Sequence, residues 1–172
     1  MGSNQRTQTK IAQKTSGMII SIVTIGKNMP SWVADGYAEY AKRLPNDYRI
    51  QLIEIAAEKR TPKSDLNKII TAEETKISNA IPKGSYSIAL DRIGKSTDTK
   101  TLAKRLQTWH DNQQSICFVI GGPEGLSEHF LKNADEVWTL SAMTLPHPLV
   151  RIVLAEQIYR AWSITINHPY HR

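Results

Sequence analysis

Short apolar runs rich in β-branched residues alternate along the chain with segments whose apolar residues recur at helical spacing. The run at 115–120 is apolar throughout, which is typical of a strand buried on both faces of a parallel sheet. The pattern predicts an α/β fold with a mostly parallel sheet flanked by helices. The predicted strands are 19–25, 49–56, 86–90, 115–120 and a short strand before Trp138. The predicted helices are 32–44, with Ser31 as a possible N-cap, 64–80, 97–111 and 149–164, and loops are expected at 57–63 and 92–97.

The predicted C-terminal helix, 149–164, is apolar around well over half of its circumference. Its main polar strip consists of Glu156, Arg160 and Ser163, at positions i, i+4 and i+7. A helix this apolar must be buried on more than one side. The sheet can cover one side and a second subunit the other, so we expect a homodimer.

The first 17 residues are rich in Ser, Thr, Gln and Lys and have no hydrophobic period. We expect residues 1–17 to be disordered, as a leader or an artificial extension, because they lack the apolar core of a signal peptide. Residues 18–172 have the size of one domain, and 40% hydrophobic and 22% charged residues are ordinary for a soluble one.

Composition also excludes several classes of protein. No apolar run approaches the ~18–20 residues of a membrane-spanning helix, so no membrane partner is expected. Cys117 is the single cysteine, which rules out an intramolecular disulfide and a cysteine-rich zinc site and fits a reducing compartment. We therefore expect a cytoplasmic protein without a bound metal.

The net charge of +6 is compatible with nucleic acid binding but does not establish it. Residues 1–17 contribute three cations and no acid. In the rest of the chain 19 Lys and Arg residues stand against 16 Asp and Glu residues, so the predicted domain is only mildly basic.

Two glycine-containing segments resemble nucleotide-binding motifs without matching them. Gly94-Lys95-Ser96 resembles the end of a P-loop, but Ala89 stands where that motif has its first glycine, so we interpret the segment as a strand-to-helix turn. The run 121–125, GGPEG, is neither G-x-G-x-x-G nor a Walker sequence. Cys117 lies inside a predicted strand and is expected to be a small buried hydrophobic residue.

The region after the fourth predicted strand is the best candidate for a ligand site. Glycines 121, 122 and 125 allow a ligand to approach the backbone at the carboxyl end of a parallel strand, where open α/β sheets bind small molecules. The stretch 138–148, WTLSAMTLPHP, is uncharged up to its histidine, and its free backbone groups suit a neutral moiety such as adenine.

The C-terminal tail combines cations, imidazoles and an aromatic ring. Such a set suits phosphate contacts and base stacking on RNA. A metal site is disfavoured because no cysteine or carboxylate cluster accompanies the histidines, and a frayed terminus without function is the main competing interpretation. The residues concerned are His147, Arg151, Arg160, His168, Tyr170, His171 and Arg172.

Four separated segments together resemble one family. They are 26–30 (GKNMP), 120–127 (IGGPEGLS), 140–151 (LSAMTLPHPLVR) and 159–172 (YRAWSITINHPYHR). In this order they resemble the ribosomal large-subunit methyltransferase H (RlmH) family of the SPOUT superfamily, over residues 18–172. Met143 stands where the family pattern usually has leucine, which is a mild apolar change.

The resemblance implies a single SPOUT-type domain with a C-terminal trefoil knot and a homodimer. It also implies transfer of a methyl group from S-adenosylmethionine to N3 of a pseudouridine in 23S rRNA, within an assembled ribosome. The alternatives are a related knotted methyltransferase acting on another RNA site and a non-catalytic RNA-binding module. By matching positions, the cofactor residues are Leu90, Gly121, Gly122, Leu140, Ser141, Ala142, Met143, Thr144, Leu145 and Pro146.

The expected chemistry is a displacement at a sulfonium methyl by an imide nitrogen that must lose its proton. A base with a pKa near the working pH would help, which makes His171 or His147 candidates. Arg160 or Arg172 would hold phosphate or stabilise the deprotonated base, and Tyr170 would stack on RNA. The sequence does not choose among these roles, and any of these residues can serve RNA positioning alone.

Overall fold

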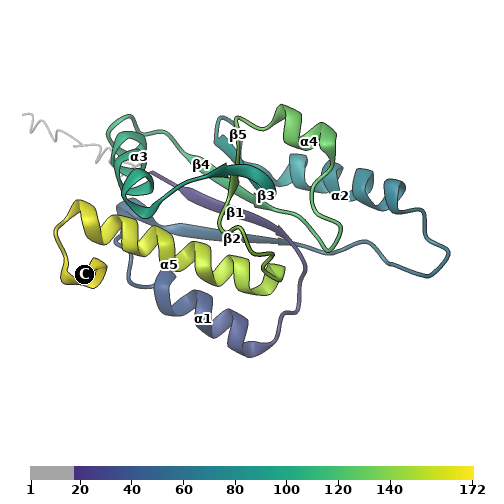
Figure 1. Ribbon diagram of the computed structural model, residues 1–172, viewed down its shortest axis with the longest axis horizontal. Coiled ribbons are helices and arrows are strands. Elements are labelled where there is room, and N and C mark those ends of the chain that lie inside the picture. The colour runs from purple at the N-terminus through teal and green to yellow at the C-terminus, as the bar shows by residue number, and fades with distance from the viewer. Residues whose placement is uncertain (1–17) are drawn as a thin grey trace, which may run out of the picture.

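In the computed structural model, which describes residues 18–172, five parallel strands form one sheet in the order β2-β1-β4-β3-β5 (Figure 1). The predicted α/β class is confirmed, and the expected disordered segment 1–17 lies outside the described residues. The strands are β1 (Ile20–Ile25), β2 (Ile50–Ile55), β3 (Tyr86–Ser96), β4 (Ile116–Ile120) and β5 (Glu136–Thr139); the helices are α1 (Ser31–Ala41), α2 (Leu66–Ala80), α3 (Thr99–Asp111), α4 (Glu128–Asn133) and α5 (His147–Thr165), with short 3-10 turns η1 (Asn46–Tyr48) and η2 (Pro169–His171).

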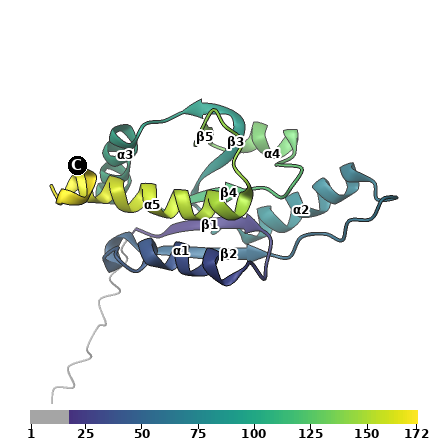
Figure 2. The same cartoon turned by 60° about the horizontal axis from the view of Figure 1, so that its bottom comes forward.

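Helices cover both faces of the sheet, which gives three layers (Figure 2). Alternate residues of a strand point to opposite faces, so Ile20 and Ile22 pack with α3 and α5, whereas Val23 and Ile25 pack with α2 and α4. All six β1 residues are buried. The central strands β1 and β4 therefore anchor the sheet whose carboxyl edge carries the site described below.

Several expected boundaries differ from those observed. Helix α1 ends at Ala41, and Pro30 rather than Ser31 is its N-cap residue. Helix α5 begins at His147, two residues before the predicted start. Ser163 is fully buried, with its hydroxyl donating to the Arg160 carbonyl at 2.7 Å, so the predicted polar strip is wrong at this position.

Strand β3 is longer than predicted and contains a bulge. Leu90 and Lys95 both lie opposite Trp138 of β5, so residues 91–94 are looped out of the ladder. Gly94 is required there, because a Cβ atom on it would lie 2.3 Å from the Trp138 carbonyl carbon. The expected loop at 92–97 and the expected strand-to-helix turn at 94–96 are thus wrong: the polar composition signals a bulge within a continuing strand.

A carboxylate and several aromatic rings join β3, α3 and β5. Glu136 accepts hydrogen bonds from Tyr86 Oη at 2.6 Å, from Arg105 Nη1 at 2.7 Å and from Trp138 Nε1 at 2.6 Å. The Arg105 guanidinium lies 4.6 Å from the Trp109 ring centroid. The Arg105 side chain, with help from the Tyr86 and Trp138 donors, lowers the pKa of Glu136 to about 2.

This carboxylate makes a testable contribution to acid stability. A depressed pKa stabilises the fold fully above pH 4.5, and the stabilisation is lost as the pH falls toward 2. Since 1 pKa unit is about 1.4 kcal/mol and the side chain is partly exposed, we expect a contribution of about 2–3 kcal/mol. Glu136→Gln should lower the free energy of unfolding in urea at pH 7 and flatten its decline between pH 5 and pH 2. Glu128→Gln, at an exposed site, serves as the control, and equal pH profiles for the two variants would contradict the assignment.

Cys117 is fully buried in β4, and burial raises the pKa of its thiol to about 12. The expected packing role of this residue is therefore confirmed. Within residues 18–172, no helix is long and apolar enough to cross a membrane.

Candidate active site

A cavity of about 570 Å³ opens at the carboxyl edge of the sheet, between the end of β4, the β3 bulge and the start of α5. This volume suits a cofactor-sized ligand. The cavity brings together three segments that are far apart in sequence. Its lining contains Leu90, Gly121, Gly122, Leu140, Ser141, Met143, Thr144, Leu145, Pro146 and His147, together with Asp91, Arg92, Ile120, Pro123, Glu124, Gly125, Thr139 and Val150.

The glycine turn, residues 121–125, is compact because side chains are absent from it. A Cβ atom on Gly121 would lie 2.6 Å from the Gly125 carbonyl carbon, and Gly125 itself has a φ of +81°. Gly125 N donates to the Gly122 carbonyl at 2.9 Å and closes the turn. The tight closure leaves the end of β4 open toward the cavity.

The segment between β5 and α5 forms a second wall without charged side chains. Thr139 Oγ1 donates to the Ser141 carbonyl at 2.9 Å, and Met143 N donates to Ser141 Oγ at 2.9 Å, so the wall is held by its own short hydrogen bonds. Ala142 is exposed and is missing from the cavity lining, unlike its six neighbours in 140–146. Met143 is 77% exposed and lies at the rim.

His147 and Arg151 lie on the first turns of α5 below the cavity. Burial, and then the charges of Arg151 and Arg60, lower the pKa of His147. The imidazole is therefore neutral at neutral pH and able to accept a proton. Arg151 is only 1% exposed, and it donates to Glu54 Oε1 at 2.7 Å and to the Gly26 carbonyl at 3.4 Å. The structure thus separates Arg151 from the tail residues with which the sequence grouped it.

An ion network centred on the buried Glu73 lies behind the glycine turn. Arg60 Nη1 donates to Glu73 Oε1 at 2.9 Å, and Arg60 Nε donates to Glu124 Oε2 at 2.9 Å. Glu73 is only 3% exposed. The missing Cβ of Gly122 points at this network, 3.0 Å from Glu73 Oε2 and 3.2 Å from Arg60 Nη2. Sequence reasoning missed Arg60 and Glu73; the only signal was one arginine in an otherwise lysine-rich loop.

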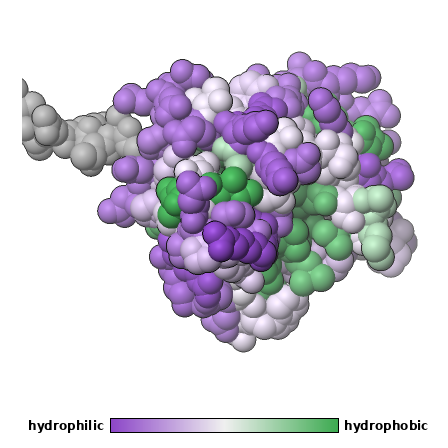
Figure 3. Space-filling view, turned by 60° about the vertical axis from the view of Figure 1, so that its left-hand side comes forward, coloured by the Kyte–Doolittle hydropathy of each residue, from purple (hydrophilic) through white to green (hydrophobic). Residues whose placement is uncertain are grey.

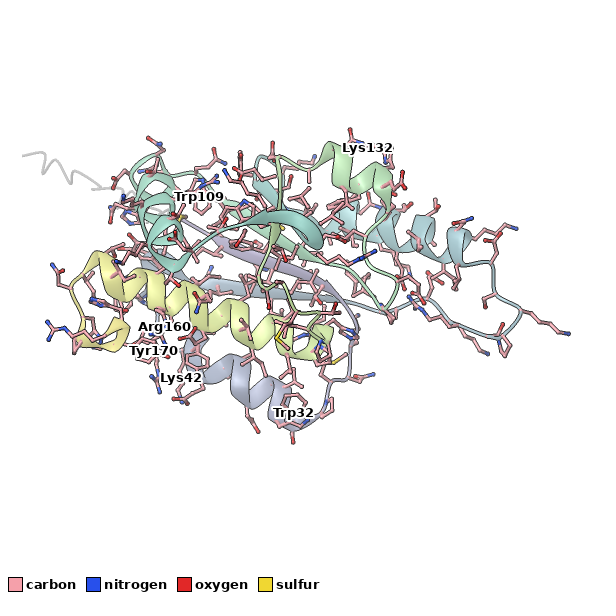
Figure 4. The ribbon with its side chains drawn as sticks, in the orientation of Figure 1. Trp32, Lys42, Trp109, Lys132, Arg160 and Tyr170 are labelled. Carbon is pink, nitrogen blue, oxygen red and sulfur yellow. The ribbon has the colours of Figure 1, made fainter. Side chains whose placement is uncertain are left out.

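The C-terminal tail is packed against α5 and is not frayed. Tyr170 Oη donates to Glu156 Oε1 at 3.0 Å, and its ring lies 4.7 Å from the Tyr159 ring. Burial and the Glu156 carboxylate raise the pKa of Tyr170 to about 12, so this phenol is a donor and not a base. The Arg160 guanidinium lies 4.8 Å from the Tyr170 ring centroid, and Figure 4 shows the two side chains together beneath α5.

The tail and the cavity lie at opposite ends of α5 (Figure 1). The helix has 19 residues, which at a rise of 1.5 Å per residue gives a length of about 28 Å. Of the five candidates for proton transfer and RNA contact, the structure therefore places His147 at the cavity and Arg160, Tyr170, His171 and Arg172 away from it. Within one chain these two groups do not meet.

Comparisons with known proteins agree with this geometry. A family model described as predicted SPOUT methyltransferase matches residues 18–171. The chain belongs to the SPOUT methyltransferase family. It is 52% identical, over 155 residues that make up 90% of this chain and all of the relative, to a protein of Coxiella burnetii (strain Dugway 5J108-111) named ribosomal RNA large subunit methyltransferase H. The chain is thus a methyltransferase, as the resemblance implied.

Solved structures of low sequence identity share the fold. A probable methylase family protein from Haemophilus influenzae Rd KW20 superposes with a TM-score of 0.54 at 16% identity, over 88% of this chain and 67% of the other. A probable methyltransferase from Bordetella pertussis Tohama I gives 0.51 at 12% identity, over 85% and 96%. The trefoil knot stays an expectation that family membership carries.

Proposed function

We propose that the protein transfers a methyl group from S-adenosylmethionine to N3 of a pseudouridine in 23S rRNA. The observation that carries the proposal is the cavity at 121–125 and 139–147, which unites the segments implied by the family resemblance. The Coxiella relative, whose name specifies large-subunit ribosomal RNA, supports the substrate class. An rRNA substrate would also make the cytoplasm the site of action.

The residues of the cavity fit S-adenosylmethionine. The glycine turn brings Gly121 and Gly122, which have no side chains, into the lining beside Leu90, and the wall at 140–146 has no charged side chain. When bound, S-adenosylmethionine supplies an electrophilic methyl group on a positively charged sulfur. A neutral wall excludes water without over-stabilising that charge, so the residues of the wall contribute by orienting the ligand. Within residues 18–172 no group of three or more His, Cys, Asp or Glu side chains is placed to hold a metal ion.

His147 is the group of the cavity best suited to take the proton from the imide nitrogen. Its lowered pKa keeps the imidazole neutral, which a base requires. The second part of the proposed site would make the phosphate and base contacts to RNA. Its residues are Arg160, Tyr170, His171 and Arg172. His171 remains an alternative base, provided that the tail reaches a cavity.

A homodimer would bring His147 of one subunit close to the tail residues of the other. No residue of the tail lines the cavity of its own chain, so we infer that the tail of one subunit serves the cavity of the other. Exposed apolar side chains on α1 and α5 favour such a partner: Trp32 is 52% exposed and Leu149 is 37% exposed. Figure 3 shows apolar side chains gathered in strips on one face rather than scattered singly.

We expect the protein to sediment at twice 19.4 kDa at micromolar concentration. Leu149→Glu should shift it toward the monomer, because a charge would enter the apolar interface. Ile93→Glu changes an equally apolar residue that is 70% exposed on the β3 bulge, and it should leave the dimer intact. A wild-type monomer would contradict this prediction.

Nucleoside analysis tests the proposed reaction. Large-subunit rRNA from a strain lacking the gene should lack one methylated pseudouridine, and the purified protein with S-adenosylmethionine should restore it. Restoration of a methyl group at a different RNA nucleoside would favour the related knotted methyltransferase, and RNA binding without transfer would favour the binding module.

A further inference from the structure

Four exposed cations follow strands of the sheet at its carboxyl edge, the edge at which the cavity opens. Lys27 follows β1, Lys59 and Lys63 follow β2, and Arg92 lies on the β3 bulge and lines the cavity mouth. We name these four residues the basic rim. None of them has an ion-pair partner among residues 18–172.

The acidic residues at the same edge are each bound within the protein. Glu54 pairs with Arg151 at 2.7 Å, Glu58 pairs with Lys76 at 2.5 Å, and Glu124 binds Arg60. Asp91 Oδ1 accepts a hydrogen bond from Ile93 N at 3.1 Å. Within the part of the chain that the structure describes, Glu73 and Glu124 share the one charge of Arg60, and Asp91 has no cationic partner, so these carboxylates are only partly compensated. The four cations of the basic rim have no ion-pair partner in that part either and outnumber the carboxylate charge that remains, so this edge is net positive.

The loop that carries two of these cations is fixed in place. Glu58 N donates to Glu73 Oε1 at 2.9 Å, and Arg60 Nη1 donates to the Glu58 carbonyl at 2.9 Å, so both neighbours of Lys59 are held. A turn closed by Ser64 N on the Thr61 carbonyl, at 2.9 Å, holds the backbone around Lys63. The bonds from Arg60 to Glu124 tie the loop to the glycine turn. The backbone that carries Lys59 and Lys63 therefore has a set position relative to the glycine turn.

We propose that the basic rim binds the phosphates of the RNA strand on either side of the methylated nucleotide. This inference rests on the proposed function. RNA phosphates are spaced along a strand and are bound by separate, exposed cations, whereas a single anion would require convergent ones. The rim cations follow three different strands at the edge where the cavity opens, and one of them, Arg92, lines the cavity. Cations spread along this edge can hold an RNA strand while one of its nucleotides enters the cavity.

Removal of charge from the rim tests the proposal. In K27Q/K59Q/K63Q the KM for ribosomes that lack the methyl group should rise ~tenfold or more. The slope of log(kcat/KM) against log[salt] should also become shallower by about 2, because each phosphate contact contributes about 0.7–0.9 to that slope. The affinity for S-adenosylmethionine, measured by calorimetry, should stay within twofold, because none of the three lysines lines the cavity.

Two controls separate phosphate contacts from net charge. K83Q/K100Q/K104Q removes the same charge from exposed sites away from the rim and should leave both quantities near wild type. K27R/K59R/K63R keeps the charge and should retain the affinity for ribosomes. Equal effects of the two glutamine triples would overturn the inference. A wild-type protein that does not methylate ribosomes would instead overturn the proposed function.

Discussion

Gly121→Val should abolish binding of S-adenosylmethionine, with a loss of affinity of more than about 100-fold. A Cβ atom at this position would lie 2.6 Å from the Gly125 carbonyl carbon, 2.7 Å from its oxygen and 2.9 Å from Leu126 N. These are backbone atoms that have no alternative rotamer, so the glycine turn must open, and a strain of a few kcal/mol is expected at such an overpacked position. Calorimetry with S-adenosylmethionine measures the loss.

Gly84→Ala is the matched control, because a Cβ atom there meets nothing within 4 Å. Its φ of +76° should make this variant less stable by about 1 kcal/mol, while the affinity for the cofactor stays unchanged. Circular dichroism confirms that both variants are folded before affinities are compared. A folded Gly121→Val that binds with wild-type affinity would show that the pocket lies elsewhere.

Gly122→Val should act by a different route from the one that the sequence suggests. The sequence assigns Gly122 to a turn that lets a ligand approach the backbone, so a side chain here would be expected to meet the ligand. The Cβ position instead faces Glu73 and Arg60 behind the turn. The expected damage is therefore to the ion network around Glu73. The direction of a missing side chain depends on the backbone angles of the turn, which residue types alone do not determine.

The elements that sequence reasoning placed well are those with a strong local pattern. Strand β4 is apolar throughout and was predicted within one residue, and α3 was predicted within two. The β3 bulge was missed because its polar residues 91–94 have the composition of a loop, and pairing with β5 is a non-local contact. The buried Ser163 was placed on the polar strip for a similar reason, since a hydroxyl can be satisfied by its own helix.

The candidate site shows the same division between local and non-local information. The cavity segments were found because glycines and an uncharged stretch are local signals. The pairing of Arg60 with Glu124, which are 64 residues apart, has no such signal. The separation of His147, which lines the cavity, from Tyr170, which packs against Glu156 and Tyr159, has no such signal either.

Removal of residues 168–172 should abolish methyl transfer and leave the affinity for S-adenosylmethionine within about threefold. The truncation deletes Tyr170, His171 and Arg172, whose combined loss of stacking and phosphate contacts we expect to cost about 2–5 kcal/mol of productive RNA binding. The cofactor cavity lies at the other end of α5 and keeps all of its lining residues. Methylation of ribosomes and calorimetry with the cofactor, on the same preparation, measure the two effects.

Single substitutions distinguish the function of the tail from its packing. Tyr170→Phe removes the hydrogen bond to Glu156 but keeps the ring against Tyr159, so it should lose less activity than the truncation. His171→Ala and Arg172→Ala leave that packing intact, and a large loss of transfer in either one identifies a direct role in the reaction or in RNA binding. A fully active truncation, in contrast, would remove the tail from the site and leave His147 as the remaining candidate for proton transfer.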